Sequence, residues 1–305
     1  MYSTARLFAL LGIVVLSGCA GGAFTSPSTP LLPQSAHQSA PAAPAQSVVF
    51  ISVPSVNAIE SFPGGVANPK AAVAIKNGID NPAGIAVGGS GTLFVNNVGN
   101  NTVTEYAPGS TKPNFTLKLS AGIGDAIAAG PDDSLYVTDQ NSDIDVYPLH
   151  ATQPSAILPN PGNGGPSYGL GAMAVDKAND VFVVGHGGEC CGTGVFEYPA
   201  SSPNSTFVRG TGAMGGGIAV DAAGDLFTSP GGTLRKNFVH VLHRDGTSTN
   251  FKSPPIALMT YDAAHHYLYS TFGTVTIYDY ATRKIVGTVP HIFDAYGIAV
   301  RPAAF

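Results

Sequence analysis

The stretch "GIAVDAAGDLFT", Gly217 to Thr228, joins two short apolar segments through a polar turn. In such turns an Asp side chain accepts hydrogen bonds from nearby backbone N–H groups, and Gly adopts the positive φ that the turn requires. The stretch therefore predicts a strand, a tight turn and a second strand. Asp221 is interpreted as a turn former, and so are Asp176 and Asp262 in related stretches.

The same phrase recurs along the chain, and its successive copies begin 42, 46, 45, 41 and 39 residues apart. Each copy before the last is followed by two more strand-like segments, as in "NTVTEYAPGSTKPNFTLKL". Four antiparallel strands in every ~40 residues are typical of a β-propeller blade. The copies are "GIAVGGSGTLFV" from Gly84, "AIAAGPDDSLYV" from Ala126, "AMAVDKANDVFV" from Ala172, the opening stretch, a weaker "LMTYDAAHHYLYS" from Leu258, and "GIAVRP" from Gly297.

The two ends of the repeat region are complementary. "VVFISV", Val48 to Val53, reads as the second strand of a blade, and the first strand of that blade is missing before it. The final "GIAV", 297–300, supplies such a strand. Pairing it with the N-terminal three strands would remove an exposed sheet edge. We therefore predict an all-β fold, a six-bladed β-propeller of four-stranded antiparallel blades closed by its C-terminal strand.

The phrase G-I-A-V-D-x-x-G-x-L-F/Y resembles the NHL-type propeller repeat, and the similarity covers nearly all of Ser47 to Pro302. WD40 blades match less well because the chain has no Trp. The architecture is also similar to that of lactonases of the gluconolactonase type and of streptogramin B lyases. The lactonase resemblance implies a divalent cation held in the axial channel by Glu, Asn and Asp side chains. The lyases are seven-bladed and use a His that has no assignable counterpart here.

The N-terminus has the pattern of a secretory signal. Arg6 precedes an apolar run, Leu7 to Leu16, which is followed by small residues. "LSGC", residues 16–19, resembles the lipobox of bacterial lipoproteins. This resemblance implies that residues 1–18 are a signal peptide and that Cys19 is acylated, for example with palmitate. Acyl chains anchor a protein to a membrane without spanning it.

The segment after Cys19 is expected to be a flexible tether. Ala20 to Gln46 contains five prolines and no Asp, Glu, Lys or Arg, a composition that buries too little apolar surface to fold. The predicted organisation is thus a signal peptide (1–18), a lipidated Cys and disordered tether (19–46), and a propeller (47–305). Localisation is expected in the cell envelope on the extracytoplasmic side. Ala20 is not the Asp that marks inner-membrane retention in enterobacteria, which favours the outer membrane or cell surface.

Charge limits the partners. The formal net charge is −5, so there is no positive field to attract phosphate backbones, and nucleic acid is not expected as a partner. The protein is expected to be a monomer.

Strand alternation sorts the loops between two faces. Loops between the second and third strands of each blade share a face with the blade-to-blade links; we call this the link face, and the opposite one the turn face. Two loops on the link face, 185–194 and 229–237, are longer than their counterparts. Binding groups are commonly mounted on such loops. The candidate ligand-binding residues are Asp125, Tyr168, His186, Glu189, Arg235, Lys236, His291, Asp294 and Tyr296.

The loop "GHGGECCGTG" contains the other two cysteines, Cys190 and Cys191. In an oxidising compartment a vicinal disulfide is favoured, although adjacent Cα atoms only ~3.8 Å apart would strain it. Metal binding with His186 and Glu189 is the alternative. The loop lacks a C-x-x-C spacing, and no metal site is assigned to it. His265 and His266, in a turn on the other face, are expected to be solvated.

Two functions remain open. The favoured one is a membrane-anchored module that recognises a protein, peptide or glycan through the link face. The alternative, implied by the lactonase resemblance, is a metal-dependent hydrolase or lyase in which Asp125 and Asp294 help to hold Ca²⁺ or another divalent cation at the channel mouth. The sequence leans towards a protein that is not an enzyme, because the channel-facing positions are mostly Gly, Ala and Ile.

Overall fold

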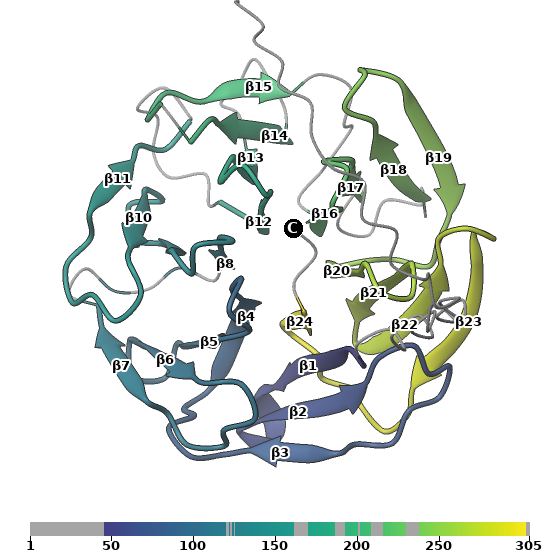
Figure 1. Cartoon of the computed structure of the whole chain (residues 1–305), viewed down its shortest axis with the longest axis horizontal. Coiled ribbons are helices and arrows are strands. Elements are labelled where there is room, and N and C mark those ends of the chain that lie inside the picture. Colours follow the sequence, from purple (N-terminus) through teal and green to yellow (C-terminus); the bar gives the residue numbers. More distant parts are fainter. Residues whose placement is uncertain are drawn as a thin grey trace, which may run out of the picture. The chain divides into compact units, whose positions relative to one another are not determined.

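Six four-stranded antiparallel sheets stand around a common axis as the blades of a propeller (Figure 1). The computed structural model describes residues 46–119, 122, 124, 126–161, 170–186, 193–200, 202–208, 216–229 and 238–302, which lie within one compact unit, Ala43–Phe305. None of the helices in these ranges has the length and apolarity that a membrane span needs.

Each blade is built from consecutive strands, except that the first blade takes its innermost strand from the end of the chain. Blade 1 comprises β24 (Ile298–Arg301), β1 (Val48–Val53), β2 (Ala58–Pro63) and β3 (Val73–Ile75), with the short 3₁₀ helix η1 (Pro54–Val56) between β1 and β2. Blade 2 comprises β4 (Pro82–Val87), β5 (Leu93–Asn97), β6 (Thr102–Tyr106) and β7 (Phe115–Lys118). Blade 3 comprises β8 (Ile127–Ala129), β9 (Leu135–Thr138), β10 (Ile144–Tyr147) and β11 (Ala156–Leu158).

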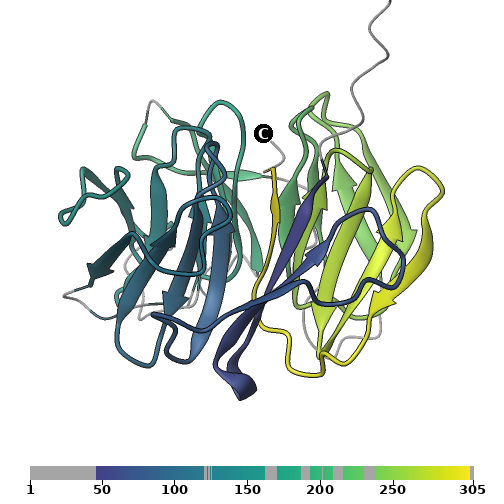
Figure 2. The same cartoon turned by 60° about the horizontal axis from the view of Figure 1, so that its bottom comes forward.

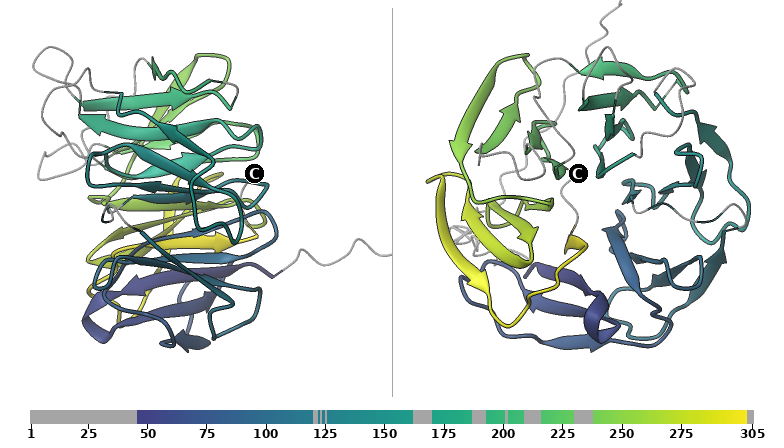
Figure 3. Two further views of the ribbon diagram at one scale, coloured as in Figure 1. Left: turned by 90° about the vertical axis from the view of Figure 1, so that its left-hand side faces the viewer. Right: turned by 180° about the vertical axis from the view of Figure 1, so that it is seen from behind.

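The remaining three blades follow in chain order, and their innermost strands surround the axis when the ring is seen from behind (Figure 3). Blade 4 comprises β12 (Met173–Val175), β13 (Val181–His186), β14 (Thr193–Tyr198) and β15 (Thr206–Val208). Blade 5 comprises β16 (Ile218–Val220), β17 (Leu226–Thr228), β18 (Phe238–Leu242) and β19 (Ser248–Lys252). Blade 6 comprises β20 (Leu258–Asp262), β21 (Tyr267–Phe272), β22 (Thr274–Asp279) and β23 (Lys284–Val289).

Ring closure occurs where the sequence predicts it. β24 pairs antiparallel with β1, in the register Val48 to Arg301, Phe50 to Ala299 and Ile51 to Ile298 (Figure 2). Because the C-terminal strand completes blade 1, the inner edge of β1 is not left unpaired. The predicted six-bladed, all-β architecture is therefore confirmed.

The core between blades rests on one aromatic position that recurs in every blade. It lies on the second strand and faces a small residue of the innermost strand, Ala in five blades and Thr260 in blade 6. All six side chains are buried, so each inter-blade space contains a ring from the second strand, in register with a smaller residue of the innermost strand. These residues are Phe50, Phe94, Tyr136, Phe182, Phe227 and Tyr269.

The predicted turn formers act as expected. Asp221 Oδ1 accepts the backbone N–H groups of Ala223 and Asp225, both at 2.9 Å. Asp176 Oδ1 accepts two N–H groups in the same way, from residues 178 and 180. The repeated phrase therefore marks these side chains as structural caps of the turns on the turn face.

Candidate functional site

Only part of the predicted binding set lies within the described residues. His291, Asp294 and Tyr296 belong to the described link between β23 and β24. The backbone of His186 ends β13, whereas its side chain is outside the description. The predicted residues that lie outside the described ranges are Cys19, Asp125, Tyr168, Glu189, Cys190, Cys191, Arg235 and Lys236.

The β23–β24 link is fixed to the neighbouring loop of blade 1. Asp294 Oδ2 accepts the N–H of Ser55, in η1, at 2.9 Å. The N–H of Tyr296 donates to the carbonyl of Ser52 at 3.0 Å, and the hydroxyl of Ser52 accepts the N–H of Gly297 at 2.6 Å. Asp294 thus holds two segments of the link face together through a backbone contact.

An aromatic patch, defined as Phe272, Phe293 and Tyr296, lies on this part of the link face. Their exposed fractions are 53%, 77% and 42%. A β-bridge between Gly273 and Ala295 brings the β21–β22 turn beside the β23–β24 link, so the three rings come from adjoining segments. Exposed rings in such proximity are unusual on a soluble monomer and commonly mark interaction sites.

The channel mouth beside the patch is an apolar cavity of about 280 Å³. Its wall includes Leu170, Leu258 and Tyr296, and the rest of the lining is Gly and Ala. Behind it the channel narrows to spaces of about 50 and 110 Å³ lined almost wholly by Ile, Ala, Val and Met. A ligand can therefore place an apolar group at the mouth without entering the axis.

A metal centre of the lactonase type would need several oxygen ligands around one point. Among the described residues, no group of three or more His, Cys, Asp or Glu side chains is placed to hold a metal ion. Of the two carboxylates that the alternative invokes, Asp294 is engaged with the N–H of Ser55 and Asp125 lies outside the description.

The structure brings together one Ser, Asp and His set that the sequence did not indicate. On the turn face, Ser47 Oγ donates to Asp262 Oδ2 at 2.6 Å, and His265 Nδ1 lies 2.9 Å from that same oxygen. Ser47 is fully buried, and the same ring nitrogen of His265 faces both partners. A nucleophilic triad instead places the two partners on opposite ring nitrogens. This set therefore ties the start of blade 1 to blade 6.

The expectation that these two turn histidines are solvated is wrong for His265 and is confirmed for His266, whose side chain is exposed. His265 is paired with Asp262, and its side chain is only 25% exposed. His266 Nδ1 lies 3.0 Å from the hydroxyl of Tyr261. Both histidines have partners because the β20–β21 turn folds back on its own strands, which the spacing of the sequence does not reveal.

A second His–carboxylate pair lies between blades 2 and 3, with a buried Glu and a half-exposed His. Glu105 in β6 is buried, and His150 Nδ1 lies 2.6 Å from its Oε2. Burial raises the pKa of Glu105 above its ordinary value, and the attraction of His150 lowers it by less. This carboxylate contacts the next blade and takes no part in the link face.

The raised pKa of Glu105 predicts a pH-dependent stability. Because the folded state holds the proton more tightly than the unfolded state, the Glu105 contribution is fully present at low pH and is lost as the pH rises through the folded pKa. Urea unfolding of the wild type and of Glu105→Gln should therefore show the wild type losing stability relative to the variant as the pH rises above 4.5, the ordinary pKa of the side chain. If the wild type instead gained stability relative to Glu105→Gln as the pH rises, the ion pair with His150 would affect the pKa of Glu105 more than burial does.

Comparisons with known proteins identify the fold and go no further. No family model matches the chain, and no curated protein matches it. A functionally unknown protein from Desulfotomaculum acetoxidans has a similar structure, with a TM-score of 0.58 and 13% identity over 83% of this chain and 98% of that chain. A protein of unknown function from Bacteroides caccae gives a TM-score of 0.60 and 10% identity over 84% of this chain and 99% of that chain. At these identities the likeness shows only that the chain has the six-bladed β-propeller architecture of these two solved structures.

Proposed function

We propose that this chain is a lipid-anchored, extracytoplasmic β-propeller of the NHL type that recognises a protein, peptide or glycan through its link face. The aromatic patch of Phe272, Phe293 and Tyr296 beside the apolar channel mouth is the observation that carries the proposal. Aromatic rings supply large contact areas at a low cost in conformational entropy, and they dominate binding hot spots.

The rigidity of the surrounding frame supports a recognition role. The link that carries Phe293 and Tyr296 is held by the Asp294–Ser55 and Tyr296–Ser52 hydrogen bonds. Little ordering is therefore required of this segment on binding, which favours affinity. The lipobox-like "LSGC" and the uncharged segment after it support an anchored, outward-facing location.

The recognition proposal is tested by selection and a matched pair of variants. The chain from residue 19, with Cys19→Ser, is screened against a displayed random peptide library and a glycan array. Replacing Phe293 and Tyr296 by Ser should weaken binding of the selected ligands by more than ~10-fold, as expected for hot-spot aromatic residues. The control residues are Ile157 and Phe207, which lie on the outer strands β11 and β15 and are 56% and 48% exposed. Replacing both of them by Ser should leave the affinity for the selected ligands unchanged.

Two outcomes would contradict the proposal. Equal weakening by both pairs of substitutions would place the binding site elsewhere. A rise in melting temperature with Ca²⁺, together with bound metal by elemental analysis and turnover of a lactone panel, would instead favour the hydrolase alternative.

A further inference from the structure

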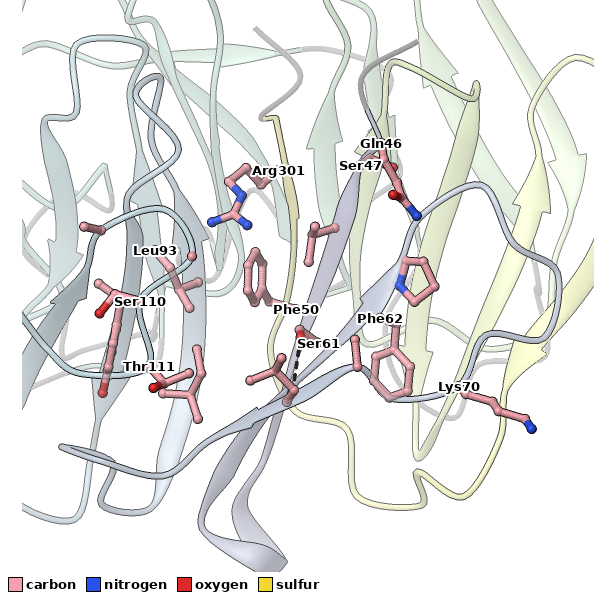
Figure 4. A pocket seen from close by; sticks show the side chains of 18 residues that line it. Gln46, Ser47, Phe50, Ser61, Phe62, Lys70, Leu93, Ser110, Thr111 and Arg301 are labelled. Carbon is pink, nitrogen blue, oxygen red and sulfur yellow. Dashed lines mark hydrogen bonds between the residues drawn. The ribbon is translucent and has the colours of Figure 1, made fainter. Parts of the chain in front are cut away.

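A second cavity, of about 480 Å³, lies on the turn face between blades 1 and 2 (Figure 4). It is independent of the aromatic patch because it lies at the opposite ends of the strands. Phe50, Phe62 and Leu93 contribute to its apolar wall, and Lys70 and Arg301 are its two cationic residues. No Asp or Glu is among its lining residues. Its size is within the range of small-molecule pockets, roughly 300–1,000 Å³.

Arg301 departs from the repeat at a position where the repeat has a structural function. The strand registers align it with Asp176 and Asp221, which directly follow the innermost strands of their blades, and with Asp262, which ends β20. There the Asp caps a tight turn into the second strand. In blade 1 the second strand comes from the other end of the chain, as the pairing of Arg301 with Val48 shows, so there is no such turn to cap. The fold alone therefore does not account for a cation at this position.

The guanidinium of Arg301 has no counter-charge among the described residues. Its Cζ lies 5.2 Å from the centroid of the Phe50 ring, and Figure 4 shows these two side chains next to each other among those that line the cavity. Burial lowers its pKa, consistent with a poorly hydrated setting. The sequence that precedes the ring, Ala20 to Gln46, contains no Asp or Glu that could pair with it. Charged groups that are partly buried are ordinarily paired with an opposite charge. An anionic group bound beside Arg301 would therefore stabilise its guanidinium.

A comparison with the next inter-blade space explains why the cavity is open. Between blades 2 and 3, buried Glu105 meets the half-exposed ring of His150 at the corresponding position. The register places Ser61 of blade 1 where blade 2 has Glu105, since these residues face Phe50 and Phe94 respectively. In the following turn, Gly109 stands three residues after Tyr106, as His150 stands three residues after Tyr147. Two large side chains are therefore replaced by two small ones, and the partly buried cation of Arg301 is added.

We propose that this cavity, the Arg301 pocket, binds an organic carboxylate with an apolar body, such as a fatty or aromatic acid. The planar guanidinium offers two parallel N–H donors that match the two oxygens of a carboxylate. The walls formed by Phe50, Phe62 and Leu93 contact the apolar body. A neutral apolar ligand would leave the guanidinium unpaired, and a small polar anion would leave the walls exposed to water.

Calorimetric titration with octanoate, and with 1-octanol as its uncharged counterpart, tests this proposal. The protein is the chain from residue 19 with Cys19→Ser. Octanoate should bind more tightly than octanol. Arg301→Met keeps an aliphatic stem over Phe50 and removes the charge, so octanoate affinity should fall by ~10- to 100-fold while octanol affinity is unchanged. Arg301→Lys should give an intermediate loss because it keeps the charge without the planar fork.

A pair of matched Trp substitutions tests whether the ligand binds in the Arg301 pocket. Neither substitution alters β24, the strand that closes the ring. Thr111 lies in the exposed β6–β7 turn and lines the pocket, and Thr152 is its counterpart in the β10–β11 turn of the next blade. Thr111→Trp should block both probes and Thr152→Trp neither. No octanoate binding to the wild type, equal affinity for the two probes, full octanoate binding by Arg301→Met, or equal effects of the two Trp variants would each overturn the proposal.

Discussion

Deletion of residues 297–305 is expected to leave the chain unable to fold as a soluble monomer. The deletion removes β24, whose Ile298, Ala299 and Val300 are all at least 93% buried. Burying Ile and Val side chains is worth roughly 1.5–3 kcal/mol each, against a total stability of about 5–15 kcal/mol for a whole domain. The deletion also leaves β1 with unpaired backbone groups at the centre of the ring, where they would recruit other chains. Size-exclusion chromatography and circular dichroism of the truncated chain provide the measurement.

A circular permutant separates the effect of pairing from that of chain order. Residue 302 is joined to residue 46 by a short Gly-Ser linker, and the chain is opened after Gly246, in the β18–β19 turn, where an added Cβ would meet nothing within 4 Å. This permutant should fold, because it keeps β24 against β1 and makes blade 1 covalently continuous. A truncated chain that folded as a monomer, or a permutant that did not fold, would show that closure by β24 is not what stabilises the ring.

Phe227→Ala is expected to lower the free energy of unfolding by about 3–5 kcal/mol, the usual cost of deleting a buried aromatic side chain. Phe227 has no exposed surface and lies between blades 5 and 6. Its ring stacks on Tyr261 with centroids 5.3 Å apart and meets Tyr280 edge-on at 5.0 Å. Such aromatic pairs add about 0.5–1.5 kcal/mol each beyond simple burial. Urea denaturation of the wild type and of Phe227→Ala, analysed with the same m-value, measures the difference in their free energies of unfolding.

Phe293→Ala is the matched control, because it removes the same atoms from a side chain that is 77% exposed. Its effect on stability should stay within about 0.5 kcal/mol, as for surface substitutions in general. A loss of less than about 1 kcal/mol for Phe227→Ala would mean that the inter-blade space collapses around the missing ring, and that the aromatic position common to all six blades is not the main support of the ring.

The candidate site could be predicted only in outline. Strand alternation correctly assigns the β23–β24 link to the same face as η1, which the Asp294–Ser55 hydrogen bond confirms. The expectation that Asp294 helps to hold a cation is not supported by that contact. The sequence does not reveal the exposure of Phe272, at the end of β21, or of Phe293, in a loop, because a ring at such a position has the same sequence signal whether it packs inwards or faces water. A search for aromatic residues in the link-face loops and at the strand ends beside them would have found both.

By itself, the sequence determined the number of blades, the closure of the ring by 297–300 and the sorting of loops between two faces. The number of blades and the sorting of loops follow from the spacing of the repeat and the alternation of strands, and the closure follows because the strand missing from the first blade is the one left over at the end of the chain. Only the tertiary structure decided which side chains meet between blades. Ser47 and Asp262 are 215 residues apart, and Arg301 faces a cavity whose walls come from β1, β2 and β5. No local pattern encodes such contacts, because each depends on the volumes and charges that two distant copies of the repeat bring to a shared space.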